Sequence, residues 1–298
     1  MTDVALKTAI VAPVEPRPVR GRFRQFARQF ARNRAGMIGL AIIAVIVLIA
    51  LFAPIVAPFD PYEMNRIERL QGPTRTHPMG TDDLGRDLFS RIVYGARISM
   101  TVGLVSVLIA TILGTPAGII AGYFGRWIDS VIMRVADVIF AFPAILLALA
   151  ITAFLGPSLR NVTISLGIVY APGFARIVRG PVLAAKTQEY VEASRVIGAS
   201  TSRILVRHLL PNVLSPILVT ATVTFSFALL AEAALSFLGL GAQPPEASWG
   251  VMLSTGRRFM ETVPSLAIFP GLAIMVTVLG SNLLGDGLRD VLDPQLRR

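Results

Sequence analysis

Six apolar stretches of about 20 residues constrain the fold of this chain more than any other feature, because a helix needs about that length to cross a bilayer. They cover residues 35–57, 98–123, 135–155, 161–178, 213–238 and 266–284. Charged residues make up only 15% of the chain, too few to cover a soluble domain against water on all sides. The sequence therefore predicts an all-α integral membrane protein with six transmembrane helices.

Individual stretches carry further signals. The first lies too deep in the chain for a cleaved signal peptide, so we expect it to remain as an anchor. In the second, Gly114, Gly118 and Gly122 predict a surface that another helix can approach closely. Pro143 lies inside the third stretch, and Pro172 interrupts the fourth, which is the least regular of the six.

The positions of Arg and Lys predict the orientation, because positively charged loops stay in the cytoplasm. With six spans and both termini inside, most of the 28 Lys and Arg residues are cytoplasmic. Residues 1–34 then form a cytoplasmic tail, 58–97 an external loop and 286–298 a cytoplasmic C-terminus. Without the fourth span, the Arg-rich segment that follows it would lie outside, which the charge bias disfavours.

The tail contains a basic, aromatic segment just before the first span. Phe23, Phe26 and Phe30 recur at helical spacing among several arginines. This pattern predicts a basic amphipathic helix on the anionic inner leaflet. A plain cluster of charges that sets the topology explains the arginines equally well.

Several classes of function lack the residues they need. The chain has no cysteine, and its two histidines, His77 and His208, are far apart, so neither a thiolate site nor a histidine pair for a metal is expected. Leu183 to Ala185 precede Lys186 without glycine, so the chain has no phosphate-binding loop of its own. The basic residues flank apolar stretches instead of forming one soluble face, which argues against nucleic acid. We expect no catalytic site, cofactor or metal.

The segment between the fourth and fifth spans, residues 179–212, is the most informative polar region. Its periodicity predicts two short helices that meet at Gly198. One face of the first helix contains Tyr190, Ala193, Ser194 and Ile197. Ser200 or Thr201 can cap the second helix, and Pro211 permits a fresh helix start into the fifth span. Such an elbow can transmit a push from a soluble partner, although a partnerless surface helix has the same periodicity.

This segment closely resembles the "EAA" loop of the membrane subunits of bacterial ABC importers, with consensus E-A-A-x₃-G-x₉-I-x-L-P. The matching residues are Glu192, Ala193, Gly198, Leu210 and Pro211. Ser194 replaces the second alanine and His208 the isoleucine. The run from Arg207 to Asn212 resembles the peptide-importer branch. The resemblance implies that the five matching residues and Ser194 couple the chain to an ATPase.

Three more stretches resemble C-type permease subunits of dipeptide, oligopeptide and nickel importers. They are residues 77–99, residues 235–250 and residues 285–294. The resemblance therefore extends over nearly the whole chain and implies the type I ABC importer permease fold in a bacterial inner membrane. In that family, we expect a permease core over 98–285 with 179–212 as its coupling loop.

These stretches also have local interpretations. Thr81 can cap a helix whose first turn contains Asp82 and Asp83, and Asp87 can support it by pairing with Arg91. That helix would lie at the membrane interface, ahead of the span that starts at residue 98. The glycines of Gly285-x-Gly287 are expected to end the sixth helix.

Glu232 is the carboxylate placed farthest inside a predicted span. A charge facing lipid is costly, so Glu232 should face the bundle interior, a partner or water. A role in the translocation pathway and a structural hydrogen bond to another helix are equally compatible with its position. Asp137, by contrast, is expected to reach the membrane interface.

The resemblance implies a heteromeric importer. Its partners would be a related B-type permease, two ATPase subunits that supply the phosphate-binding loops, and an outer solute-binding protein, all at a lipid bilayer. Peptides are the substrate class it supports, with glutathione-like peptides and nickel chelates as alternatives. An ion-coupled secondary transporter is the runner-up. It predicts internal repeats and several ionisable residues near mid-membrane, and neither is found.

Overall fold

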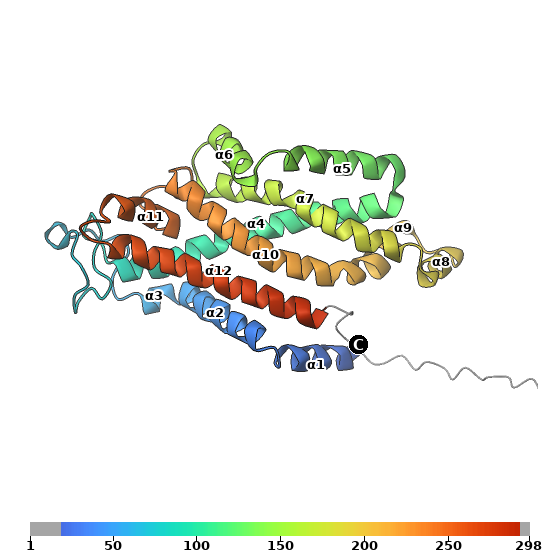
Figure 1. Cartoon of the computed structure of the whole chain (residues 1–298), viewed down its shortest axis with the longest axis horizontal. Coiled ribbons are helices and arrows are strands. Elements are labelled where there is room, and N and C mark those ends of the chain that lie inside the picture. Colours follow the sequence, from blue (N-terminus) through green and yellow to red (C-terminus); the bar gives the residue numbers. More distant parts are fainter. Residues whose placement is uncertain (1–18, 293–298) are drawn as a thin grey trace, which may run out of the picture.

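The computed structural model describes residues 19–292, with side chains from residue 25 onward. These residues are helical apart from their connections, and their one β-bridge joins Thr81 to Asp87 (Figure 1). The principal helices are α1 (Val19–Phe30), α2 (Arg34–Leu51), α3 (Ala53–Val56), α4 (Leu88–Phe124), α5 (Arg126–Phe140), α6 (Ala144–Leu155), α7 (Leu159–Ala185), α8 (Glu189–Val196), α10 (Leu210–Phe237), α11 (Trp249–Arg258) and α12 (Ser265–Leu292).

Five described helices are long and apolar enough to cross a membrane, and the bent pair of α5 and α6 makes a sixth if it crosses as one span. The all-α, multi-span architecture is therefore confirmed. The single helix expected over 135–155 is wrong, because α5 and α6 meet at 88°. Pro143 lies at the break, where it cannot donate a backbone hydrogen bond to a continuing helix.

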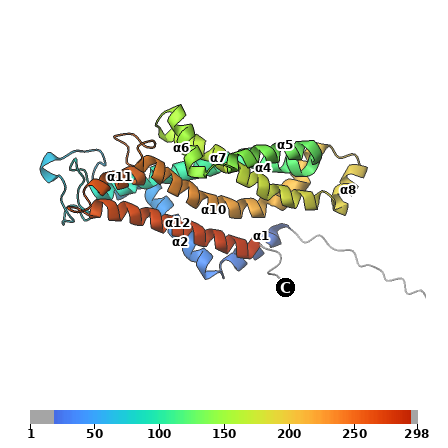
Figure 2. The ribbon, with the colours of Figure 1, turned by 45° about the horizontal axis from the view of Figure 1, so that its top comes forward.

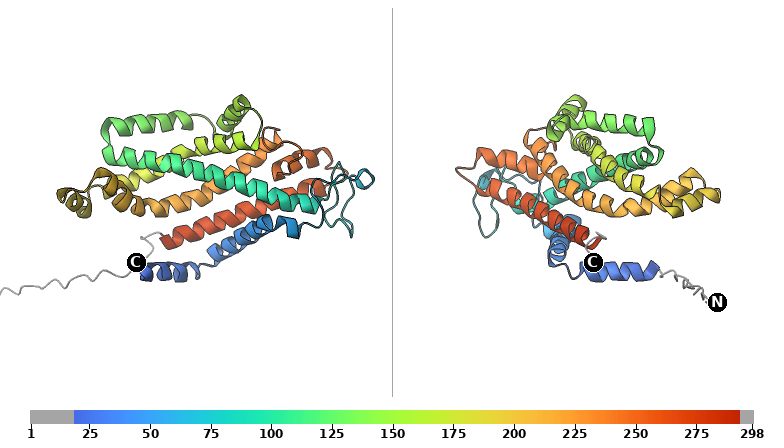
Figure 3. Two further views of the ribbon diagram at one scale, coloured as in Figure 1. Left: turned by 180° about the vertical axis from the view of Figure 1, so that it is seen from behind. Right: turned by 45° about the vertical axis from the view of Figure 1, so that its right-hand side comes forward.

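The glycines of α4 allow its close contact with α7. Figures 2 and 3 show the two helices side by side. A Cβ on Gly118 would lie 2.9 Å from the Val178 Cβ, and one on Gly122 would lie 2.9 Å from the Arg179 carbonyl oxygen. The predicted small-residue surface is thus confirmed. Helix α7 runs through Pro172 from residue 159 to 185, and so extends beyond the predicted span at both ends.

Helix α12 continues past the glycines that were expected to end it. It runs to Leu292, and Gly287 and Gly36 form the close approach between α12 and the start of α2. A Cβ on Gly36 would lie 3.0 Å from the Gly287 Cα. Asn33 caps α2 and donates a hydrogen bond to Asp290 at 2.8 Å. These glycines therefore serve packing, and the expectation that they end the sixth helix is wrong. Residues 293–298 of the expected C-terminal segment lie outside the described residues.

The basic segment before the first span forms α1, whose Phe26 and Phe30 rings stack with centroids 6.2 Å apart. Residues 1–18 of the expected tail lie outside the described residues. The first span is divided, since α2 ends at Leu51 and the short α3 follows, with Pro54 in its first turn.

The start of α4 corrects two expectations. The helix expected ahead of the second span is not separate from it, because α4 is continuous from Leu88 to Phe124. Its cap is Asp87, whose carboxylate accepts from the Ser90 backbone N–H at 2.7 Å. Thr81 is not available as a cap, since its hydroxyl donates to the Glu68 carbonyl oxygen and its backbone pairs with Asp87.

The bundle has two distinct ends (Figure 1). We call the end with α8 the elbow end and the end with residues 58–87 and α11 the loop end. Because α10 joins the two, they are separated by the length of a 28-residue helix, about 42 Å at 1.5 Å per residue.

Candidate functional site

The predicted elbow is present and comprises residues 189–209. Helix α8 is followed by a turn at Gly198, then by α9 (Thr201–Arg203) and a π-helical segment, η2 (Ile204–Leu209). Figure 2 shows α8 projecting at one end of the bundle. The Ser200 side chain caps α9 by accepting from the Arg203 N–H at 3.4 Å. Of the two caps considered from the sequence, the structure therefore uses Ser200.

Gly198 ends α8 through backbone geometry. Its φ of +79° lies in the left-handed region that favours glycine. The Gly198 N–H donates to the Arg195 carbonyl at 3.0 Å, and the Ala199 N–H to the Ser194 carbonyl at 3.0 Å. This pair of bonds is a Schellman motif. A Cβ on Gly198 would meet no atom of this chain within 4 Å, so a steric clash inside the chain is not the reason for glycine here.

The base of the elbow is fixed to the bundle. Val191, Ile204 and Leu209 are each at most 1% exposed, and they belong to one hydrophobic cluster with Phe174 and Val178 of α7. A displacement of the elbow must therefore displace the membrane helices to which it is packed.

The residues of α8 that are expected to share a face differ in burial. Val191 and Ser194 are buried, whereas Tyr190 and Ile197 are exposed. The Ser194 hydroxyl donates to the Tyr190 carbonyl oxygen at 2.8 Å, which satisfies it within the helix. Tyr190 instead reaches α10, where its hydroxyl accepts from the Asn212 amide at 2.7 Å. Contacts with neighbouring elements thus hold the short α8 in place.

The tip of the elbow exposes both charge and apolar surface. Glu192 and Ala193 are exposed on α8. Val196 is 87% exposed and Ile197 is 83% exposed, although both are large apolar side chains. An apolar tip of this kind on a fixed base is suited to insertion into a cleft of another protein.

The second half of the elbow continues into the fifth span without a fresh start. The π-helical segment passes directly into α10, and residues 201–237 read as one candidate span. Leu210 and Pro211 follow the π-helical segment directly, in the first turn of α10. The elbow and α10 therefore form one lever.

Glu232 belongs to α10, and its side chain is fully buried against α4. It accepts hydrogen bonds from the Ser99 hydroxyl at 3.1 Å and the Ser236 hydroxyl at 2.7 Å. Its carboxylate therefore joins two candidate spans, α4 and α10.

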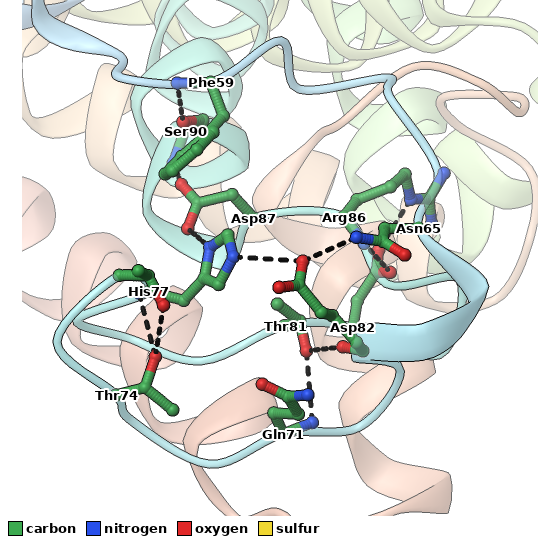
Figure 4. A network of polar contacts seen from close by, with 12 residues as sticks. Phe59, Asn65, Gln71, Thr74, His77, Thr81, Asp82, Arg86, Asp87 and Ser90 are labelled. Atoms are coloured by element: carbon green, nitrogen blue, oxygen red, sulfur yellow. Dashed lines mark hydrogen bonds and ion pairs between the residues drawn. The ribbon is translucent and has the colours of Figure 1, made fainter.

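A buried network of polar and charged side chains lies at the loop end, and the sequence patterns did not predict it as a network (Figure 4). His77 Nδ1 lies 2.8 Å from Asp87 Oδ1, and His77 Nε2 lies 3.5 Å from Glu68 Oε2. Both Asp87 and His77 are buried. The ring of His77 thus bridges two carboxylates and closes the loop onto the cap of α4.

The same network contains two arginines around one aspartate. Arg86 Nε lies 2.7 Å from Asp82 Oδ2, and Arg91 Nε lies 3.4 Å from that oxygen. Arg91 also donates to the Pro61 carbonyl at 2.9 Å. The available signal was the density of charged residues between 77 and 91, which helix capping alone does not explain.

A second set of ion pairs joins α5 to α7. Arg179 Nε lies 2.5 Å from Asp129 Oδ1 and Arg176 Nη2 lies 2.6 Å from Asp137 Oδ1. Asp137, which is expected near the membrane interface, thus has a partner on α7. Its partner lies 39 residues away, which is why local patterns did not indicate it.

Sequence comparison places most of the chain in one family. Residues 114–298 match the family described as the inner membrane component of binding-protein-dependent transport systems. Residues 21–73 match the N-terminal transmembrane domain of oligopeptide transport permease C.

Two relatives are similar over nearly their full lengths. The dipeptide transport system permease protein DppC of Alkalihalophilus pseudofirmus is 50% identical over 275 residues, which cover 92% of this chain and 90% of that protein. The glutathione transport system permease protein GsiD of Pectobacterium atrosepticum is 44% identical over 290 residues, or 97% of this chain and 96% of that one.

A solved structure shares the fold. A chain of the MetNI methionine ABC transporter, in inward-facing conformations, matches with a TM-score of 0.54 at 20% identity, covering 67% of this chain and 96% of that one. The comparisons give no support to an ion-coupled secondary transporter. The chain belongs to the binding-protein-dependent transport system inner membrane components and, within them, to the permease C branch, and is a membrane-spanning permease subunit of an ABC importer.

Proposed function

We propose that this permease moves peptides or similar small solutes across the inner membrane as one half of a heteromeric pathway. Its partners are a B-type permease, two ATPase subunits and an outer solute-binding protein. The names of the dipeptide and glutathione permeases support the peptide class. Bond chemistry belongs to the ATPases, and this chain converts their closure into helix movement.

The exposed elbow tip is the observation that carries this proposal. Val196 and Ile197 would be costly to leave in water, and burial of each in a partner cleft is worth about 1.5–3 kcal/mol. The base beneath them is locked into the bundle by Val191 and Leu209. Force applied at the tip is therefore delivered to α7 and α10.

The six coupling residues have distinct roles in this proposal. Glu192 and Ala193 face the ATPase, and Ser194 holds α8 together from the buried side. Gly198 sets the turn that presents the tip. Leu210 and Pro211 begin the helix that receives the movement. The carboxylate of Glu232 has a structural role, because both of its oxygens are bonded to serines of this chain.

In the proposed membrane orientation, both termini and the elbow lie in the cytoplasm. Its support is the concentration of Arg and Lys on that side. A reporter active only in the cytoplasm should work when fused after Lys186 and fail after Arg75. Activity of an external reporter after Lys186 would contradict the whole coupling scheme.

Co-purification from native membranes tests the partners. The tagged permease should retain a soluble ATPase and a second permease, and the reconstituted complex should hydrolyse ATP faster with loaded binding protein. Solute uptake by the isolated permease, driven by an ion gradient without ATP, would reject the proposal.

A further inference from the structure

Helix α5 presents two opposite faces that have different chemistry. Asp129, Ser130, Arg134 and Asp137 lie on one face, at helical spacing. The other face contains Val131, Val135 and Val138, each more than half exposed. The apolar face is suited to lipid, whereas the polar face requires a different environment.

The polar face borders a cavity of about 440 Å³ between α5 and α7. Its lining residues are Asp129, Ser130, Met133, Arg134, Asp137, Arg176 and Arg179. The cavity is therefore lined mainly by charged groups, which come from two candidate membrane helices. Its volume is within the range of about 300–1,000 Å³ that is typical of small-molecule sites.

The charges belong to candidate membrane helices, because α7 is long and apolar enough to cross a bilayer and α5 is part of the bent pair that can form a further span. The side chains of Arg176 and Asp137 are 52% and 65% exposed in this chain, although they pair with each other. Exposed ion pairs facing hydrocarbon are strongly unfavourable. This surface must therefore face water or another subunit.

The cavity lining contains one more guanidinium than carboxylates. Arg176 and Arg179 pair with the two aspartates, but Arg134 forms no ion pair with any described residue. A guanidinium offers a planar fork of donors that fits a carboxylate. We propose that this cavity is a water-accessible subsite of the translocation route, where Arg134 receives a carboxylate of the passing solute. This inference rests on the proposed function.

The chain has no cysteine, so a single introduced cysteine is the only thiol of this subunit, and labelling is read on this subunit after its separation from the others. Ser130→Cys places a thiol in the cavity, and Val135→Cys places one on the opposite face as a matched control. The assembled complex in vesicles is treated with anionic or cationic methanethiosulfonate reagents, and each rate is divided by the rate with a small free thiol. Only Ser130→Cys should react, and the anionic reagent should be favoured about ten-fold, since a net positive cleft concentrates anions.

Arg134→Gln in the Ser130→Cys background should remove most of that preference, and Arg134→Lys should restore part of it. An excess of trialanine should slow anionic labelling of Ser130→Cys, whereas its C-terminal amide should not. Slowing by both peptides would show binding without carboxylate recognition and would overturn the proposal. Equal reactivity of Ser130→Cys and Val135→Cys would also overturn it.

Uptake and ATP hydrolysis by the complex without added cysteines are measured in the same vesicles. Loss of both activities there would reject the proposed function. Normal uptake with an unlabelled or unselective Ser130→Cys would reject only the role of the cavity.

Discussion

Two glycines end helices in the same way at opposite ends of the bundle, in different surroundings. Gly198 ends α8 at φ +79° and Gly239 ends α10 at φ +83°. At the second site, the Leu240 N–H donates to the Leu235 carbonyl at 2.9 Å, which completes the same motif. An added Cβ would meet no atom of this chain within 4 Å at either site. Backbone strain is therefore matched, and only the environment beyond the chain can distinguish them.

The two ends differ in whether their charged and apolar side chains find partners within this chain. At the loop end, the charged side chains of Asp82, Arg86 and Arg91 are each less than 10% exposed and pair with one another. At the elbow end, Val196 and Ile197 remain uncovered. The buried charges of the loop end are thus paired within this chain, whereas the apolar tip of the elbow is left for a partner to cover.

The largest expected effect is that of Gly198→Asp. A side chain at positive φ adds strain, and the new charge would lie at the proposed ATPase contact. We expect loss of uptake and of ATPase stimulation in the reconstituted complex, while membrane insertion and pairing with the other permease stay intact.

Gly239→Asp is the control for that variant, because it imposes the same strain at the loop end. It should retain ATPase binding. Equal loss of ATPase binding in both variants would mean that helix termination, not the elbow contact, explains the result. Wild-type uptake in Gly198→Asp would show that the elbow does not carry coupling.

The second prediction concerns the stability of the loop end. Asp82→Ala leaves the Arg86 and Arg91 guanidiniums buried without their shared partner, which costs about 3–5 kcal/mol. The complex should unfold at a clearly lower temperature in a detergent thermal-shift measurement. Glu63→Ala, at an exposed position of the same loop, should leave the midpoint unchanged. Equal midpoints for the two variants would remove the stabilising role of the network.

A smaller effect is expected at the elbow tip. Ile197→Ser removes an apolar contact that only a partner can make, so the affinity for the ATPase should fall about ten-fold. The thermal midpoint of the permease alone should not change. Ile67→Ser, at a side chain 91% exposed at the loop end, provides the matched control and should not change that affinity. If Ile197→Ser lowers the thermal midpoint of the permease without weakening ATPase binding, Ile197 stabilises this chain and does not contact a partner.

Sequence patterns predicted the features that depend on neighbours along the chain. The apolar stretches indicated the spans, and Gly198 indicated the turn of the elbow. Contacts between distant residues changed the rest. Gly287 packs against Gly36 and so does not end α12, and Asp137 pairs with Arg176. Capping rules favoured Thr81, whereas the loop that folds back onto α4 leaves this role to Asp87.

The smallest expected effect is that of Glu232→Gln, which tests whether the loop-end half of the bundle also satisfies its polar groups internally. Glutamine keeps the shape of the side chain and an oxygen that can accept from Ser99 or Ser236, so a structural role predicts a loss of at most about 1 kcal/mol. Glu232→Leu removes both acceptors from the two hydroxyls and should cost about 1–3 kcal/mol. Thermal midpoints and uptake are compared for both variants in the reconstituted complex. If uptake falls in Glu232→Gln while the midpoint and assembly match the wild type, the charge itself acts on the pathway, and the structural role proposed for this carboxylate is wrong.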